Sequence, residues 1–166
     1  MSDNVVEGLG GDPVIQFSVF LENKVGRLSE FTRLLAKNSI HIMAMTVLDT
    51  TDSSIVRIVV DDPDQASSVL FLQGYSYTET VVLVVELNAA DEVPTMLSAI
   101  LAVEINVHYL YPFISRPSDK SALVMHLEDL DMATDVLRQN QFNVLCQSDI
   151  SRLLLQLIMR FWRISV

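Results

Sequence analysis

The stretch Leu21–Phe31, LENKVGRLSEF, holds the residues of this chain whose types and spacing best suit the binding of a ligand. Asn23, Lys24, Gly26 and Arg27 stand together there, between an alternating apolar run and a helical pattern. A glycine lets the backbone turn tightly and leaves no side chain between a ligand and the neighbouring amides. The first turn of a helix also has unpaired N–H groups and the positive end of the helix dipole, which suit a carboxylate. The junction is therefore a candidate site for a ligand that carries a carboxylate.

A simpler interpretation of the same junction stays open. Gly26 could serve only to turn the chain, and Asn23 could serve only to cap the helix that follows. The surrounding elements decide what the junction can reach.

The apolar periodicity on both sides of the junction predicts the elements that hold it in place. Residues 14–22 alternate as a half-buried strand does, and from Leu28 onward the apolar spacing becomes helical. Two strands, a helix and a last strand follow, at 38–47, 55–60, 61–74 and 75–82. The order of this first set is β-α-β-β-α-β.

The same order of elements begins again after residue 81. Ile40 corresponds to Ile105, which is 65 residues later, and Leu70 corresponds to Leu137, which is 67 residues later. The two extra residues fall in the central hairpin of the second set, where insertions are tolerated. We therefore predict a duplicated α+β fold of two ferredoxin-like units, each a four-stranded antiparallel sheet with its helices on one face.

These patterns divide the chain into four parts. A polar, glycine-rich leader at 1–13, predicted to be flexible, precedes units at 14–81 and 82–150, and a C-terminal amphipathic helix is predicted at 151–166. That last segment carries three arginines and no acidic residue. The three arginines and Gln156 form a polar stripe on an otherwise apolar predicted helix. We expect it to cover an exposed sheet or a dimer seam, and a membrane-surface or partner-binding helix is the alternative.

Composition excludes several classes of protein. The formal net charge is −10, which opposes binding to nucleic acid because phosphate contacts need clustered Lys and Arg. Half of the residues are hydrophobic, so the chain can bury a core, but no apolar run is long enough to span a membrane. The start of the chain has no secretory pattern, which favours a cytoplasmic protein.

The junction and its elements together resemble the ACT domain, a small ligand-sensing module of amino-acid metabolism. The family pattern is Asn-x-x-Gly-x-Leu between a strand and a helix, with Asn or Ile near the start of the next strand. This chain supplies Asn23, Gly26 and Leu28, followed by Asn38, Ile40 and Ile42. The tandem arrangement is similar to stand-alone bacterial proteins built of two ACT units without an attached enzyme.

The resemblance implies that an amino acid binds at an interface between units. One wall would be the junction, and the opposite wall would be the second strand of a neighbouring unit, at Ile40–Met43 or at Ile105–His108. The expected ligand-binding residues are Asn23, Lys24, Val25, Gly26, Arg27, Leu28, Ile40, His41, Ile42 and Met43.

The second unit departs from this pattern at its own junction, LNAADEVPTML. It lacks the glycine and carries Asp91 and Glu92, which would repel a carboxylate and compete for the same amides. We expect this second site to be absent, altered or capped by its own side chains.

Other residues that could carry chemistry have simpler explanations. His41, His108 and His126 are not spaced as metal ligands, and we expect neither a metal nor a cofactor. Cys146 is predicted to be a small buried hydrophobe in the last strand. Asp61, Asp62 and Asp64 suit helix capping better than paired-carboxylate catalysis, and no catalytic motif stands out, so we expect no enzyme activity.

The sequence thus supports a non-catalytic regulatory protein that binds an amino acid and forms a homodimer through sheet or helix packing. The alternative is a structural module that assembles with a partner enzyme of amino-acid metabolism and binds no ligand itself.

Overall fold

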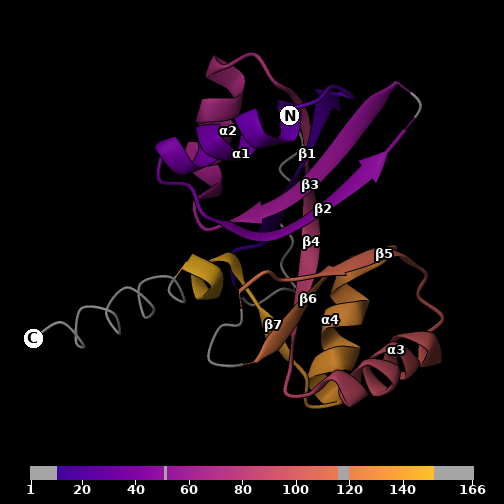
Figure 1. The fold of residues 1–166 in the computed structure, drawn as a ribbon. Coiled ribbons are helices and arrows are strands. Elements are labelled where there is room, and N and C mark those ends of the chain that lie inside the picture. The colour runs from indigo at the N-terminus through magenta and orange to yellow at the C-terminus, as the bar shows by residue number, and fades with distance from the viewer. Residues whose placement is uncertain (1–10, 51, 116–119, 152–166) are drawn as a thin grey trace, which may run out of the picture. The chain divides into compact units, whose positions relative to one another are not determined.

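The computed structural model of the protein describes residues 11–50, 52–115 and 120–151. The described chain forms two compact units (Figure 1). The first unit contains residues 15–80, and the second contains residues 81–151 together with residues 11–14.

The first unit has the predicted β-α-β-β-α-β order. Its elements are β1 (Val14–Glu22), α1 (Arg27–Lys37), β2 (Ile42–Asp49), β3 (Ser53–Val60), α2 (Pro63–Leu72) and the first part of β4 (Ser76–Leu87). The strands lie in the order β2-β3-β1-β4, and β3 pairs antiparallel with both β1 and β2. Because β2 ends this order, it is an edge strand of the first unit.

The core of the first unit lies between one face of its sheet and its two helices. Phe17, Val19 and Leu21 alternate along β1 and are buried, which confirms the strand predicted from their spacing. Phe31 and Leu35 bury the inner face of α1 against them. Figure 1 shows α1 and α2 together on this face of the sheet.

The second unit repeats this arrangement. Its elements after β4 are a short 3₁₀ helix η1 (Ala90–Glu92), α3 (Val93–Ala102), β5 (Val107–Pro112), β6 (Ser121–Leu127), α4 (Leu130–Gln139) and β7 (Asn143–Leu145). β4 pairs antiparallel with β6 and with β7, and β5 pairs with β6. Met96, Ile100 and Leu137 pack the helices onto the sheet. The predicted fold, two ferredoxin-like α+β units, is confirmed.

The duplication extends to the conformation of single residues. The carboxylate of Asp62 accepts a hydrogen bond from the Gln65 amide at 3.0 Å and caps α2, as Asp129 does for α4 with the Met132 amide at 2.9 Å. Ser39 and Glu104, which follow α1 and α3, have φ angles of 57° and 56°. The second helices of the two units therefore begin in the same way, and the first helices end in the same way.

Two predicted elements differ in the structure. The stretch at residues 76–87 was expected to contain the end of one strand and the start of another, but it forms the single twelve-residue strand β4. The stretch contains no glycine, proline or asparagine between residues 76 and 87 that could turn the chain, and its valines favour extended backbone. One strand therefore serves both sheets.

Cys146 is not a buried hydrophobe of the last strand, which corrects the prediction. β7 ends at Leu145, and Cys146 is a partly exposed residue that immediately precedes a helical segment starting at Gln147. Its thiol lies 3.0 Å from the Ser148 hydroxyl and donates to Asp149 Oδ2 at 3.0 Å. Polar neighbours, rather than an apolar core, surround this sulfur.

The acidic cluster at the start of α2 is only partly a cap. Asp62 caps the helix as predicted, but Asp61 accepts hydrogen bonds from the backbone N–H of His41 and lies 2.8 Å from its Nδ1. The C-terminal helix predicted at 151–166 lies, from residue 152 onward, outside the described residues, as do residues 1–10 of the predicted leader.

Candidate ligand-binding site

The junction between β1 and α1 is built around Gly26, which occupies the N-cap position of α1. Its φ and ψ angles are 90° and −20°, a left-handed conformation that residues with a Cβ adopt at a cost. The Gly26 carbonyl accepts the first helical hydrogen bond, from the Glu30 amide at 2.9 Å. This left-handed backbone conformation explains why the turn needs a glycine at position 26.

Several backbone N–H groups at the junction have no acceptor within the described part of the chain. The amides of Lys24 and Arg27 donate to Glu22 O and Lys24 O at 2.8 and 3.3 Å. No side chain caps α1 among the described residues. The N–H groups left without an intrachain acceptor belong to Val25, Gly26, Leu28 and Ser29. Such a cluster at a helix start can accept a carboxylate.

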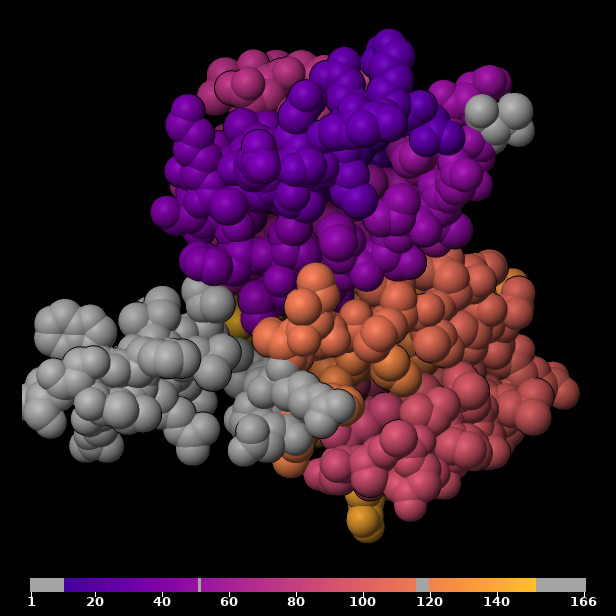
Figure 2. Space-filling model, in the orientation of Figure 1, coloured from indigo at the N-terminus to yellow at the C-terminus, as the bar shows by residue number. Residues whose placement is uncertain are grey.

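The space beside these amides is open. A Cβ added to Gly26 would meet nothing within 4 Å, and the Val25 side chain is fully exposed. The β1–α1 segment, indigo in Figure 2, forms much of the visible surface of the first unit. The junction on its own is therefore an open surface rather than an enclosed pocket.

The charged residues of the junction are paired with one another. Glu22 contacts Lys24 Nζ at 2.9 Å and Arg27 at 3.2 Å, and Arg27 also contacts Glu30 at 3.2 Å. Hydrogen bonds from Lys24 and Arg27 lower the pKa of Glu22, and those to Glu22 and Glu30 raise the pKa of Arg27. The two basic side chains therefore order the junction, while the open amides remain its free donors.

Asn23 does not cap α1, so that part of the simpler interpretation is wrong. Its Nδ2 donates instead to Asp49 Oδ1 at 3.0 Å, at the end of β2. This bond joins the junction to the neighbouring hairpin. Asp49 could not be assigned to the junction from the sequence, because it lies between the strands predicted at 38–47 and 55–60, where no local pattern links it to Asn23.

The structure places Ile40–Met43 at the other end of the same unit. β2 begins with Ile42 opposite Val60 and ends with Asp49 opposite Ser54. Successive residues advance about 3.3 Å along a strand, so the ends of the eight-residue β2 lie roughly 23 Å apart. The two predicted walls of the site are therefore not brought together within one unit.

The residues of this second wall differ in exposure. Ile40 and Met43 are each 2% exposed, so their side chains are unavailable and only their backbone could touch a ligand. Ile42 is partly buried and packs against the core, whereas His41 is exposed and held by Asp61. His41 is thus the side chain of this wall that a ligand could reach.

The junction of the second unit is occupied by its own side chain. Glu92 Oε2 accepts the Asn88 amide at 2.8 Å, and Glu92 Oε1 accepts Asn88 Nδ2 at 3.0 Å. These bonds, first from the side chain and then from the backbone of Asn88, lower the pKa of Glu92. The Glu92 carboxylate is therefore bound within this junction, although it caps neither η1 nor α3.

The described residues contain no group of three His, Cys, Asp or Glu side chains that could hold a metal ion. Among the same residues, no helix is both long and apolar enough to cross a membrane.

Residues 13–154 match the family of the ACT domain pair. The chain belongs to this family. ACT domains are a regulatory type of domain. Each unit of this chain carries a junction at the start of its first helix. None of the curated proteins is similar enough to this chain to count as a relative.

Solved structures share the fold of this ACT domain pair. Protein BT0572 from Bacteroides thetaiotaomicron has 28% sequence identity and a TM-score of 0.76, over 84% of this chain and 96% of that one. The ligand-free regulatory subunit of aspartate kinase from Thermus thermophilus has 15% identity and a TM-score of 0.55, over 76% and 91%. The latter likeness concerns the fold alone.

Proposed function

We propose that this ACT domain pair is a non-catalytic sensor that binds an amino acid at the β1–α1 junction of its first unit. The observation that carries the proposal is the group of unbonded N–H groups around Gly26, with open space beside them. Family membership supports the same function, since ACT domains are regulatory.

The carboxylate of the ligand would accept hydrogen bonds from these amides. Hydrogen bonds that involve an ionised partner are stronger than neutral ones, and the dipole of α1 adds to the attraction. Glu22 and Glu30 are engaged by Lys24 and Arg27, so they repel the ligand less than free carboxylates would. Asp49, held near the junction by Asn23, would receive the ligand ammonium.

A second copy of the chain would complete the site. β2 is an edge strand, and its sequence, IMAMTVLD, contains no lysine or proline to block pairing. Antiparallel pairing of two β2 strands about a twofold axis sets the start of each beside the end of the other. His41–Met43 of one copy would then face the junction of the other copy, which Asn23 ties to the end of β2.

The surroundings of the junction suit such a contact. Exposed apolar side chains lie in the junction itself and on the strands that end beside it, and these are Phe20, Val25, Leu28, Val47 and Leu48. Association would remove some of this apolar area from water. Because the ligand would lie between copies, its binding would favour the associated arrangement over the separate one.

Two matched glycine variants test the proposal. Gly26 and Gly74 both have a left-handed backbone, with φ angles of 90° and 73°, and an added Cβ meets nothing within 4 Å at either position. Gly26→Ala and Gly74→Ala should therefore lose similar stability, about 1–2 kcal/mol each. Only Gly26→Ala should weaken ligand binding, because its strain disturbs the amides that grip the carboxylate.

The measurement is the melting temperature across the twenty amino acids. At about a hundredfold excess over Kd, a ligand adds roughly 2.7 kcal/mol, which raises the melting temperature by about 5–10 °C in a protein of this size. The parent and Gly74→Ala should show this rise for at least one amino acid, and Gly26→Ala should show a smaller one. No rise with any amino acid, or an equal rise in Gly26→Ala, would leave the chain as an assembly module.

A further inference from the structure

The helix that begins at Gln147 starts in an unusual way. The first four N–H groups of a helix have no partner within it and need acceptors from elsewhere. Here the Gln147 amide donates to Asp12 O at 3.0 Å, and the Ser148 amide donates to Asp12 Oδ1 at 3.3 Å. The two donors are therefore satisfied by a residue that lies at the opposite end of the sequence.

The residue at the N-cap position, Cys146, does not supply this capping itself. Ser, Thr, Asp and Asn are the side chains that cap helices well, because each carries an oxygen acceptor. The Cys146 thiol instead donates to Asp149 Oδ2, and the same oxygen accepts the Cys146 amide at 3.0 Å. The start of this helix thus depends on Asp12 for the acceptors that a better cap would provide locally.

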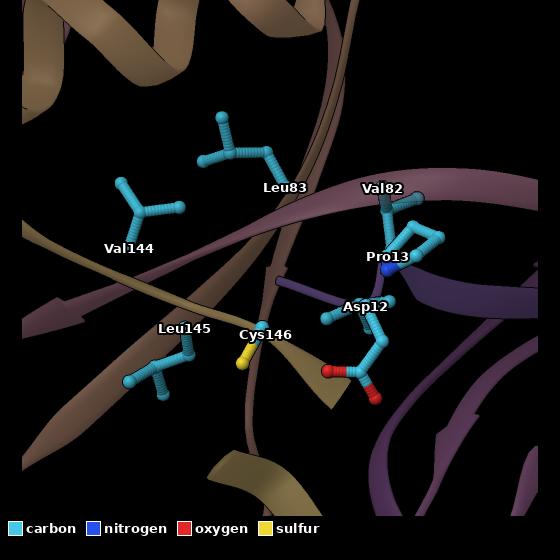
Figure 3. Close-up of a pocket in the computed structure, with 8 residues that line it drawn as sticks. Asp12, Pro13, Val82, Leu83, Val144, Leu145 and Cys146 are labelled. Carbon is cyan, nitrogen blue, oxygen red and sulfur yellow. The ribbon is translucent and has the colours of Figure 1, made fainter. Parts of the chain in front are cut away.

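Gly11 also lies against the Cys146 side chain. A Cβ added to Gly11 would lie 3.0 Å from Cys146 Cβ and 3.1 Å from its Sγ, closer than side-chain carbons normally approach. Asp12, Pro13 and Cys146 also line one small hollow together with Val82 and Leu83, as Figure 3 shows. Gly11, Asp12, Ser148 and Asp149 therefore all lie close to the Sγ atom of this partly exposed cysteine.

We propose that Gly11–Pro13 forms a latch, which closes on Cys146–Ser148 to hold the helical segment that starts at Gln147 and opens to expose the Cys146 thiol more fully. All of these residues belong to the second unit. Ile150, in the same helical segment, is 0% exposed, and the closed latch holds this segment in place. An open latch leaves the amides of Gln147 and Ser148 without their acceptors, so the helix frays from its first turn.

The thiol reports directly on the latch. Cys146 is partly exposed, and movement of Gly11 away from it gives a reagent wider access to Sγ. The rate of alkylation therefore rises with the fraction of molecules with an open latch. Iodoacetamide is a suitable probe because it is small and uncharged. The full chain is used, in native buffer, and the rate is compared with that of the parent protein.

Asp12→Ala removes the side-chain acceptor and should raise the alkylation rate about fivefold to tenfold, the change in opening that follows from a lost cap. Asp12→Asn keeps an oxygen acceptor and should stay within about twofold of the parent. Asp135→Ala is the matched control, since it removes an exposed carboxylate of the same unit that has no part in the latch. It should leave the rate unchanged.

This set separates capping from charge, because a thiolate is the reactive form and a nearby carboxylate disfavours it. If the acceleration were electrostatic, Asp12→Asn would react as fast as Asp12→Ala, and the latch would be disproved. Hydrogen exchange gives an independent readout: the Gln147 and Ser148 amides should exchange faster in Asp12→Ala, and Gly11→Ala should show the same change with Asp12 intact. Unchanged exchange in both variants would equally overturn the proposal.

Discussion

At the scale of residues, the two junctions of this chain differ in whether a carboxylate of the chain itself binds an amide there. In the second unit, Glu92 supplies one from within the chain and binds the amide and side chain of Asn88. In the first unit, Gly26 stands in the corresponding place, and the neighbouring amides face open space. The second junction therefore binds a carboxylate of its own chain, whereas the first binds none among the described residues.

Glu92→Gln tests this internal carboxylate. The folded state lowers the pKa of Glu92 below its ordinary value of 4.5, so the ionised group stabilises the fold above that pH and the contribution is lost as pH falls through the lowered pKa. The parent should melt at a higher temperature than Glu92→Gln at pH 7, and the two should converge in acid. A difference that persists unchanged down to pH 3 would show that ionisation of Glu92 has no part in it.

At the scale of elements, the duplicated helix caps provide a matched comparison. Asp62 and Asp129 each accept one amide hydrogen bond at the first turn of a helix, at 3.0 and 2.9 Å. Asp62→Ala and Asp129→Ala should each lower the free energy of unfolding by about 1 kcal/mol.

Chemical denaturation of the two variants measures these costs. Asp64→Ala, which removes an acidic residue of the first turn of α2 that is not the cap, serves as the control and should cost clearly less. Equal losses in Asp62→Ala and Asp64→Ala would mean that the helix dipole, and not the cap, dominates.

The order of the elements could be predicted from the sequence, because each depends on local spacing. Alternation of Phe17, Val19 and Leu21 gave a strand, and the 65- and 67-residue correspondences gave the duplication. The length of β4 was missed, since nothing in apolar periodicity separates one long strand from two that adjoin.

Contacts between residues distant in sequence could not be predicted in this way. Asn23 bonds to Asp49, His41 to Asp61, and Asp12 to Ser148. Each involves a short polar side chain in a turn or at the end of an element, where local pattern allows many partners. The glycine of the junction could be identified, but not the fact that the two expected walls lie at opposite ends of one unit.

At the scale of the whole molecule, the edge of β2 is the feature on which the proposed assembly depends. Val47 is 43% exposed, so replacing it should cost little stability. Val47→Lys adds a charge to an edge strand, which natural sheets use to prevent pairing with another copy. This variant should therefore shift the protein from dimer towards monomer and lose the amino-acid-dependent rise in melting temperature.

Size-exclusion chromatography with light scattering measures the association, and the thermal scan measures binding. Phe71→Lys, at an exposed position on α2, is the control and should leave both association and binding unchanged. A dimeric Val47→Lys that still binds its ligand would assign the second wall to Ile105–His108 instead of β2.

The helical segment that starts at Gln147 depends on Asp12, and this dependence affects where a fragment of the chain can begin. Strand β1 begins at Val14, so a fragment designed to start at the first regular element would begin just after the residue that caps the helix at Gln147. Such a fragment would keep every strand and helix of both sheets and yet be damaged at its far end. Fragment boundaries for this chain should therefore be drawn before Gly11, with purification tags separated from it by a flexible spacer.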